Sequence, residues 1–155
     1  MALVYFGLGT NLGDKERNLC LAIDKIRERI GKVTSQSAFY ASEPWGFEST
    51  NSFINAVICA ETSIPPILLM KETQEIEKEI GRNKKSVDGL YSDRVIDIDI
   101  LLYDDLILHT ENLTIPHPLM TERLFVMKPL SEIAPQLVIP GTEKTVQSFY
   151  EELSL

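Results

Sequence analysis

The sequence predicts an α+β fold of the ferredoxin-like type, a βαββαβ core in which an antiparallel sheet carries helices packed against one face. Segments with strand and helix patterns follow one another in the order strand, helix, strand, strand, helix, strand. The last of these, residues 95–103, alternates polar and apolar side chains as a half-buried strand does. Because 155 residues fall within the roughly 100 to 200 residues of one domain, we expect residues 1–155 to form a single domain with a C-terminal extension.

The first strand and the first helix have clear boundaries. Residues 2–8 (ALVYFGL) are apolar and run into a segment rich in Gly and Asn, which is typical of a buried strand followed by a turn. A helix is expected next, with Asp14 as its N-cap and Gly31 at its C-terminal end. The apolar stripe of this helix consists of Leu19, Ala22, Ile23, Ile26 and Ile30.

The middle of the chain predicts two more strands and a second helix. Residues 33–41 and 52–61 are rich in β-branched and aromatic residues, which indicates strands. The segment between them, SEPWGFESTN, is longer than an ordinary hairpin loop, and long loops often carry function. The second helix is predicted over residues 67–80, after two prolines and before Gly81. Further on, TIPHPLMTERLF is typical of a loop that enters a helix, and the last dozen residues show a weak helical pattern.

Composition and charge argue against several classes of protein. The chain has 23 acidic and 15 basic residues and a formal net charge of -8, whereas a general nucleic-acid binder needs clustered Lys and Arg. Its apolar runs are far shorter than the ~18 residues of a membrane-spanning helix, and the N-terminus lacks the basic start of a secretory signal. Cys20 and Cys59 lie in apolar runs, where buried thiols are expected. We therefore expect a soluble, cytoplasmic protein without a nucleic-acid, membrane or obligate protein partner.

The triplet Asp97-Ile98-Asp99 is the most distinctive chemical feature. The two-residue period of a strand places both carboxylates on one face, about 7 Å apart. Mg²⁺ is usually bound by one or two carboxylates together with water and substrate phosphates, so the triplet suits a metal–nucleotide site. The alternative is an amphipathic strand whose solvated face happens to carry Asp. Since Asp is depleted in strands, two in one strand require an explanation.

A locally basic loop, RNKKSVDGLYSDR, directly precedes this strand in an otherwise acidic chain. Arg can bind phosphate oxygens with two parallel hydrogen bonds, and Lys can act as a point charge. A solvated surface loop is the alternative for the loop alone. A basic, Gly-containing loop that leads into Asp-x-Asp favours phosphoryl transfer, because cations neutralise the charge that develops on the phosphates.

A second group of residues is suited to a flat heterocycle. Phe53 and Asn55 are two residues apart on a predicted strand and therefore share a face, where an aromatic ring can stack and an amide can bind the edge of a base. Each Phe considered alone is better explained by burial in the core, where Phe is common. His117, between two prolines, could donate to a phosphate, whereas His109 is expected to be structural or at the surface.

Other motifs of nucleotide, metal or nucleophilic chemistry do not fit the sequence. GLGTNLGD has the spacing G-x-G-x-x-x-G and lacks the context of a dinucleotide-binding fingerprint, and no Walker A run is present. No spacing of Cys and His indicates zinc, and no serine lies in a G-x-S-x-G turn.

Five separated segments together resemble one family, the 6-hydroxymethyl-7,8-dihydropterin pyrophosphokinases of folate biosynthesis. They are GLGTNLGD, SEPWGFESTNSFINAV, TQEIEKEIGR, RVIDIDILLYDD and IPHPLMTERLFVMKPLSEIAP, in the order of the family. The resemblance implies a ferredoxin-like fold and transfer of pyrophosphate from ATP, as co-substrate, to the hydroxymethyl oxygen of the pterin, with release of AMP and with two Mg²⁺ ions as cofactors.

The resemblance also implies roles for individual residues. The metal ligands would be Asp97 and Asp99, and the catalytic set would be completed by Arg82 and Arg94. The ATP-binding residues would be Gln74, Glu77, Lys84, Tyr91, Ile98, His117 and Arg123. The pterin would lie between Phe53 and Phe125, and its site would also include Ser42, Glu43, Trp45 and Asn55.

Three departures from the family pattern fall in the basic loop, one of which is a slightly long segment between Lys84 and Tyr91. Ser92 and Asp93 precede Arg94 where the family usually has a small pair such as Gly-Pro, and Lys84 stands in place of a more common arginine. Two other functions remain open. One is an ATP-dependent phosphotransferase acting on another heterocyclic alcohol, and the other is a non-catalytic ferredoxin-like module that binds a small ligand.

Overall fold

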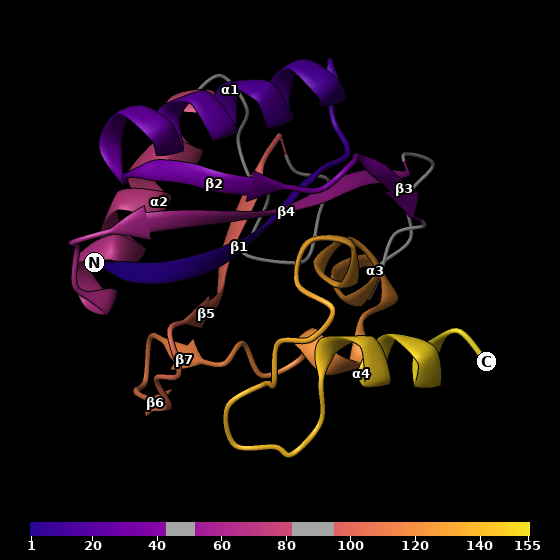
Figure 1. Cartoon of the computed structure of the whole chain (residues 1–155). Coiled ribbons are helices and arrows are strands. Elements are labelled where there is room, and N and C mark those ends of the chain that lie inside the picture. The colour runs from indigo at the N-terminus through magenta and orange to yellow at the C-terminus, as the bar shows by residue number, and fades with distance from the viewer. Residues whose placement is uncertain (43–51, 82–94) are drawn as a thin grey trace.

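The computed structural model describes residues 1–42, 52–81 and 95–155 (Figure 1). In chain order its elements are β1 (Ala2–Thr10), α1 (Lys15–Arg29), β2 (Lys32–Gln36), β3 (Tyr40–Ser42), β4 (Phe53–Thr62), α2 (Pro66–Gly81), β5 (Asp97–Tyr103), β6 (Leu108–His109), β7 (Thr114–Ile115), the 3-10 turn η1 (Met120–Glu122), α3 (Leu124–Ile133) and α4 (Val146–Leu153).

The main sheet has the strand order β2-β4-β1-β5, and each of these neighbours is antiparallel to the next. With its connecting helices α1 and α2, this is the βαββαβ arrangement in which the first strand lies between the third and the fourth. The predicted ferredoxin-like fold class is confirmed. The short strands β6 and β7 form a separate hairpin.

The segment expected to form one strand over residues 33–41 forms two, and Ser37 accounts for the break. Its backbone N–H donates to the carbonyl of Val57 at 2.9 Å, and its side-chain Oγ accepts the N–H of Val57 at 2.9 Å. The hydroxyl thus replaces a backbone carbonyl in the ladder, and β3 begins at Tyr40, which pairs with Asn55. Hydrophobic periodicity does not reveal a side-chain acceptor of this kind.

Helices cover both faces of the described sheet (Figure 1). Helices α1 and α2 pack on one face, as predicted, around a core that includes Phe6, Leu19, Ile26, Ile58, Leu69 and Ile76. Helices α3 and α4 cover the other face around Val57, Leu101, Leu102, Met127 and Leu130. The C-terminal third therefore supplies a second layer. No helix in the described ranges combines the length and the apolarity needed to cross a membrane.

Helix α1 begins as predicted, because the Oδ1 of Asp14 accepts the N–H of Arg17 at 3.2 Å and caps the helix. The expectation that both thiols are buried is half wrong. Cys59 on β4 is buried, but Cys20 is exposed. Cys20 lies one helical turn from Glu16 and from Asp24, which are exposed too, so it belongs to the solvated face of α1.

Candidate active site

Three neighbouring strands bring polar groups into one row near the same end of the sheet. Gly9 on β1 is paired with Asn55 on β4 and with Asp97 on β5. Side chains of directly paired residues point to the same face, and neighbouring strands are about 4.8 Å apart, so Asn55 and Asp97 share a face about 10 Å apart. Gly9 places no side chain between the amide and the carboxylate.

The two aspartates of β5 are held as the strand period predicts. Asp97 and Asp99 are half-buried, whereas Ile98 and Ile100 are buried on the opposite face, within the core under α1 and α2. The backbone N–H of Ile98 points toward α2 and donates to the Oε2 of Glu77 at 2.7 Å. This hydrogen bond fixes the helix against the strand that carries the aspartates.

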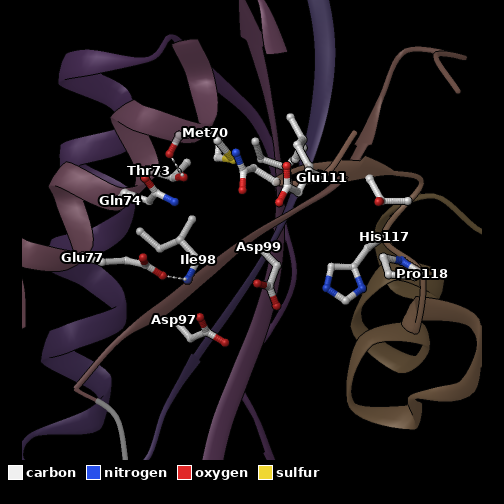
Figure 2. Close-up of a pocket in the computed structure, with 14 residues that line it drawn as sticks. Met70, Thr73, Gln74, Glu77, Asp97, Ile98, Asp99, Glu111, His117 and Pro118 are labelled. Carbon is white, nitrogen blue, oxygen red and sulfur yellow. Dashed lines mark hydrogen bonds between the residues drawn. The ribbon is translucent and has the colours of Figure 1, made fainter. Parts of the chain in front are cut away.

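A pocket of about 360 Å³ opens beside β5, within the size range of small-molecule sites (Figure 2). Its walls come from three parts of the chain. Helix α2 contributes Met70, Thr73, Gln74 and Glu77, β5 contributes residues 97–100, and the segment around β7 contributes residues 111–114 with His117 and Pro118. Figure 2 shows Gln74 and Glu77 on one side, His117 on the other, and Asp97 and Asp99 between them.

The carboxyl groups of Glu77, Asp97 and Asp99 line this pocket. The pKa of the Glu77 carboxyl is raised to about 8, chiefly by burial and in smaller part by the charges of Asp97 and Asp99, against the opposing effect of the hydrogen bond from Ile98. Carboxyl groups this close together favour the binding of a cation between them. Among the described residues, no group of three or more His, Cys, Asp or Glu side chains is placed to hold a metal ion, and Asp97 and Asp99 are a pair.

His117 presents a neutral N–H donor to the pocket. Its Nδ1 accepts the backbone N–H of Leu119 at 3.3 Å, so the proton of the neutral imidazole lies on Nε2. Burial lowers the pKa of His117, and the positive charge of Arg123 lowers it as well, against a smaller opposing effect of Asp97. A neutral Nε2–H group near a cation is suited to donating to a phosphate oxygen.

On the other side of Gly9, Phe53 and Asn55 share one face of β4, as their spacing predicted. Asn55 is only 5% exposed, and its Nδ2 donates to the Oγ of Ser42 on β3 at 2.6 Å. A Cβ atom on Gly9 would lie 3.0 Å from the Oδ1 of Asn55 and 3.6 Å from the Cδ1 of Phe53. The absence of a side chain at Gly9 thus lets the amide and the ring lie against β1.

Helix α3 brings a second aromatic residue to this side of the sheet. Phe125 is half-buried and packs against the core under α3 and α4, which is the face on which Phe53 lies. The guanidinium carbon of Arg123 lies 5.4 Å from the centroid of the Phe125 ring, within range of a cation–π contact. Arg123 therefore contacts the ring of Phe125 and is also close enough to His117 to lower the pKa of the imidazole.

The structure thus brings many of the predicted site residues together. Gln74, Glu77, Asp97, Ile98, Asp99 and His117 line the pocket, and Ser42, Phe53 and Asn55 lie on the other side of Gly9. Arg123 and Phe125 stand at the start of α3. Six other predicted residues, Glu43, Trp45, Arg82, Lys84, Tyr91 and Arg94, lie outside the described residues.

Sequence reasoning missed part of the pocket wall. Thr73 of α2 and the hairpin residues Glu111, Asn112 and Thr114 line the pocket but were not singled out. The hairpin strands β6 and β7 have only two residues each, too few for a recognisable period. The one signal in the sequence is that these polar residues directly precede the segment that contains His117.

Comparison with known proteins gives consistent matches. Residues 5–135 match the family model described as 7,8-dihydro-6-hydroxymethylpterin-pyrophosphokinase. A Porphyromonas gingivalis protein named 2-amino-4-hydroxy-6-hydroxymethyldihydropteridine pyrophosphokinase is 46% identical over 138 residues, which cover 88% of this chain and 94% of that protein. A protein of the same name from Aquifex aeolicus is 40% identical over 155 residues, 100% of this chain and 94% of that protein.

Solved structures with a similar fold contain this unit as part of a longer chain. The structure described as HPPK-DHPS in complex with substrates has a TM-score of 0.78 and 15% sequence identity, and the match covers 97% of this chain and 43% of that one. Plasmodium falciparum HPPK-DHPS has a TM-score of 0.77 at 14% identity, with 97% and 44% coverage. This chain therefore spans less than half of those chains, and at such identity the likeness concerns the fold.

Proposed function

This chain belongs to the 7,8-dihydro-6-hydroxymethylpterin-pyrophosphokinase family, and we propose that it transfers pyrophosphate from ATP to the hydroxymethyl oxygen of 6-hydroxymethyl-7,8-dihydropterin. As a pterin pyrophosphokinase it acts in folate biosynthesis. One observation carries the assignment of the site. The amide of Asn55, which suits the edge of a heterocycle, lies in the same row as the carboxylate of Asp97, which suits a metal–nucleotide complex.

Asp97 and Asp99 are proposed to hold two Mg²⁺ ions against the phosphates of ATP. The donor set fits, because both carboxylates are half-buried on one face and the surrounding negative charge contributes to the raised pKa of Glu77. Mg²⁺ takes oxygen ligands and keeps several waters, so one or two protein carboxylates are the usual number. When bound, Mg²⁺ neutralises negative charge on the triphosphate.

The pocket beside β5 is proposed to bind the nucleotide. Gln74, Glu77 and Ile98 form its wall toward α2, and His117 offers a neutral donor from the opposite side. Arg123 contributes a positive charge close to His117. Four residues outside the described ranges, Arg82, Lys84, Tyr91 and Arg94, are proposed from the family resemblance to bind ATP, with the two arginines in catalytic roles.

The pterin is proposed to lie on the Asn55 side of Gly9, between Phe53 and Phe125. The hydrogen bond from Asn55 to Ser42 supports this, because it fixes the amide in one orientation for the polar edge of a pterin ring. Glu43 and Trp45 are proposed as further pterin-binding residues from the resemblance.

In the proposed reaction the hydroxymethyl oxygen forms a bond to the β-phosphorus while the bond from that phosphorus to the α–β bridging oxygen breaks. AMP leaves with the electron pair of that bond, and the hydroxyl proton passes to solvent. The chain contributes chiefly by orienting the two reactants, since Phe53 and Asn55 fix the pterin and His117 donates to the phosphates. No side chain is assigned as an obligatory base.

We also propose that residues 1–155 act as one catalytic domain in the cytoplasm, on small-molecule substrates alone. The family match over residues 5–135 and the packing of α4 on the α3 side of the sheet support the first point. The unpaired thiols of Cys20 and Cys59 are in keeping with a reducing compartment.

The test is incubation of the purified protein with MgATP and 6-hydroxymethyl-7,8-dihydropterin, followed by separation of the nucleotides and pterins. We expect AMP and pterin diphosphate in equal amounts, and we expect Asp97→Ala to lower turnover by orders of magnitude while pterin binding largely survives. Asp105→Asn is a matched control, because Asp105 is exposed in the turn that follows β5.

The products also distinguish the other functions. Formation of ADP, or turnover with another heterocyclic alcohol in place of the pterin, would indicate a different phosphotransferase. Tight pterin binding without turnover, and unaffected by Asp97→Ala, would indicate a binding module.

A further inference from the structure

We propose that Glu132 of α3 is a positioning residue for pterin recognition, acting through Tyr40 and β3 on the hydrogen bond between Ser42 and Asn55. This inference rests on the proposed function, because it takes Ser42 and Asn55 to be part of the pterin site. Neither Glu132 nor Tyr40 was singled out by sequence reasoning.

The carboxylate of Glu132 binds two groups, one on Tyr40 at the start of β3 and one on Ala38, two residues before the strand. Its Oε1 accepts the phenolic hydroxyl of Tyr40 at 2.5 Å, and both of its oxygens lie 3.1 Å from the backbone nitrogen of Ala38. One turn earlier on the same helix, the Nζ of Lys128 lies 4.9 Å from the centroid of the Tyr40 ring. The hydrogen bond to Glu132 is also the main cause of a raised pKa of Tyr40.

These contacts replace the pairing that β3 lacks. The ladder along this edge of β4 is interrupted at Ser37, whose hydroxyl takes the N–H of Val57. Beyond the break, β3 consists of three residues only, Tyr40–Ser42. The N–H of Ala38 finds its acceptor in Glu132 on α3, outside the sheet. So short a strand needs a second anchor to hold its position, and Glu132 supplies it.

The strand register connects the contact between Glu132 and Tyr40 to the proposed pterin site. Tyr40 pairs directly with Asn55, and Ser42 pairs with Phe53. Tyr40 and Ser42 are two residues apart and share a face of β3. The Oγ of Ser42 accepts from the Nδ2 of Asn55 at 2.6 Å, so a shift of β3 changes the group that fixes the amide. Rotation about the last torsion of Asn is soft, which makes this hydrogen bond decisive for the direction in which the Oδ1 points.

The same register limits the effect to one substrate. Strand β1 separates β4 from β5, and the pocket proposed for the nucleotide lies beside β5. Neither Glu132 nor Tyr40 lines that pocket. Loss of the anchor should therefore weaken recognition of the pterin and leave recognition of ATP unchanged.

The experiment compares steady-state kinetics of the full chain with those of Tyr40→Phe, Glu132→Ala and the double variant. We expect the KM for the pterin to rise by about three- to tenfold in Tyr40→Phe, the range for loss of one hydrogen bond, with kcat and the KM for ATP within about twofold of wild type. In the Glu132→Ala background, Tyr40→Phe should raise the KM for the pterin little further, because the hydrogen-bond partner of Tyr40 is already absent.

The matched control is Tyr103→Phe at the far end of β5, where the phenolic hydroxyl donates to the carbonyl of Ile64 at 2.8 Å. It removes a comparable hydrogen bond away from β3, and should leave the pterin KM at the wild-type value. A second readout is the side-chain amide resonance of Asn55 in ¹⁵N-labelled protein, which should shift in Tyr40→Phe and remain in place in Tyr103→Phe.

Two results would overturn the inference. An enzyme that converts the pterin with an unchanged KM in both Tyr40→Phe and Glu132→Ala would remove the positioning role and leave the proposed function intact. A wild-type protein that neither binds nor converts the pterin would overturn the proposed function and this inference together.

Discussion

Glu77 and Ile98 are joined by a hydrogen bond in which the backbone N–H of the strand residue donates to the helix carboxylate at 2.7 Å. Ile98 lies between Asp97 and Asp99, so helix α2 holds the strand at the point where both aspartates project. The side chain of Glu77 has two effects there, because it satisfies a backbone donor and, with a pKa raised to about 8, it places a carboxyl that is mostly protonated at neutral pH beside the two aspartates.

The two effects can be separated by substitution of Glu77. Glu77→Ala leaves a part-buried N–H without its acceptor and should lower the free energy of unfolding by about 1 to 3 kcal/mol. Glu77→Gln keeps an acceptor and should lower it by less than about 1 kcal/mol. Urea unfolding measures both. Glu75→Ala, at an exposed position of the same helix, is the control, and equal losses in Glu77→Ala and Glu77→Gln would show that the carboxyl group itself, and not merely an acceptor for Ile98, is required.

Gly9→Ala should damage pterin recognition. Its Cβ would lie 3.0 Å from the Oδ1 of Asn55, closer than nearly all such contacts, so the amide must move. We expect a rise of about tenfold in the pterin KM, which corresponds to about 1.4 kcal/mol, with little change in the KM for ATP.

Gly7→Ala is the control for Gly9→Ala on the same strand. The new Cβ would lie 3.4 Å from the Cδ2 of Leu101, a flexible side chain that can adjust. Its pterin KM should stay within about twofold of wild type, a difference of less than about 0.5 kcal/mol. A similar rise in both variants would mean that β1 as a whole, and not the contact with Asn55, is sensitive.

Ser37→Ala should destabilise the fold. Ser37 is 3% exposed, and its hydroxyl is the acceptor for the backbone N–H of Val57. Loss of that acceptor should cost about 1 to 3 kcal/mol in the free energy of unfolding, measured by chemical denaturation. Ser35→Ala on β2 provides the comparison and should cost clearly less; a loss equal to that of Ser37→Ala would contradict the role given to the hydroxyl.

His117 predicts a pH dependence of stability. Its folded-state pKa lies below 6.5, so the unfolded chain binds the proton more readily. The contribution of the neutral imidazole is therefore present above pH 6.5 and is lost as the pH falls toward the lowered pKa. We expect wild type to lose more stability than His117→Gln between pH 7.5 and pH 5.5, as measured by thermal unfolding at each pH. Parallel curves for the two proteins would exclude this contribution.

The sequence predicted the elements whose periods are long and regular. The apolar stripe from Leu19 to Ile30 extends over several helical turns, so the helix could be predicted. The alternation around Asp97 likewise extends over several residues, so both the strand and the shared face of Asp97 and Asp99 could be predicted. The ferredoxin-like order then brought Asp97 beside the strand that pairs with Asn55.

What the sequence did not predict depends on single contacts or on very short elements. The break in the strand depends on one hydrogen bond, from the N–H of Val57 to the hydroxyl of Ser37. The anchor of β3 depends on another, from Tyr40 to Glu132. A hydrophobic pattern predicts neither bond, because it distinguishes only apolar from polar positions. The pocket wall at Asn112 and Thr114 belongs to a hairpin too short for any period. The second helical layer, α3 and α4, covers the sheet through non-local packing that no local pattern encodes.

The bond between Glu77 and Ile98 has a consequence for solubility as well. In the described sheet β5 is an outer strand, and outer strands expose backbone donors and acceptors that can pair with another chain. At β5 a carboxylate already occupies the N–H of Ile98, and the charges of Asp97 and Asp99 would repel the like strand of a second molecule. The aspartates of β5 that are proposed to bind metal thus also disfavour pairing of this strand with the same strand of another molecule.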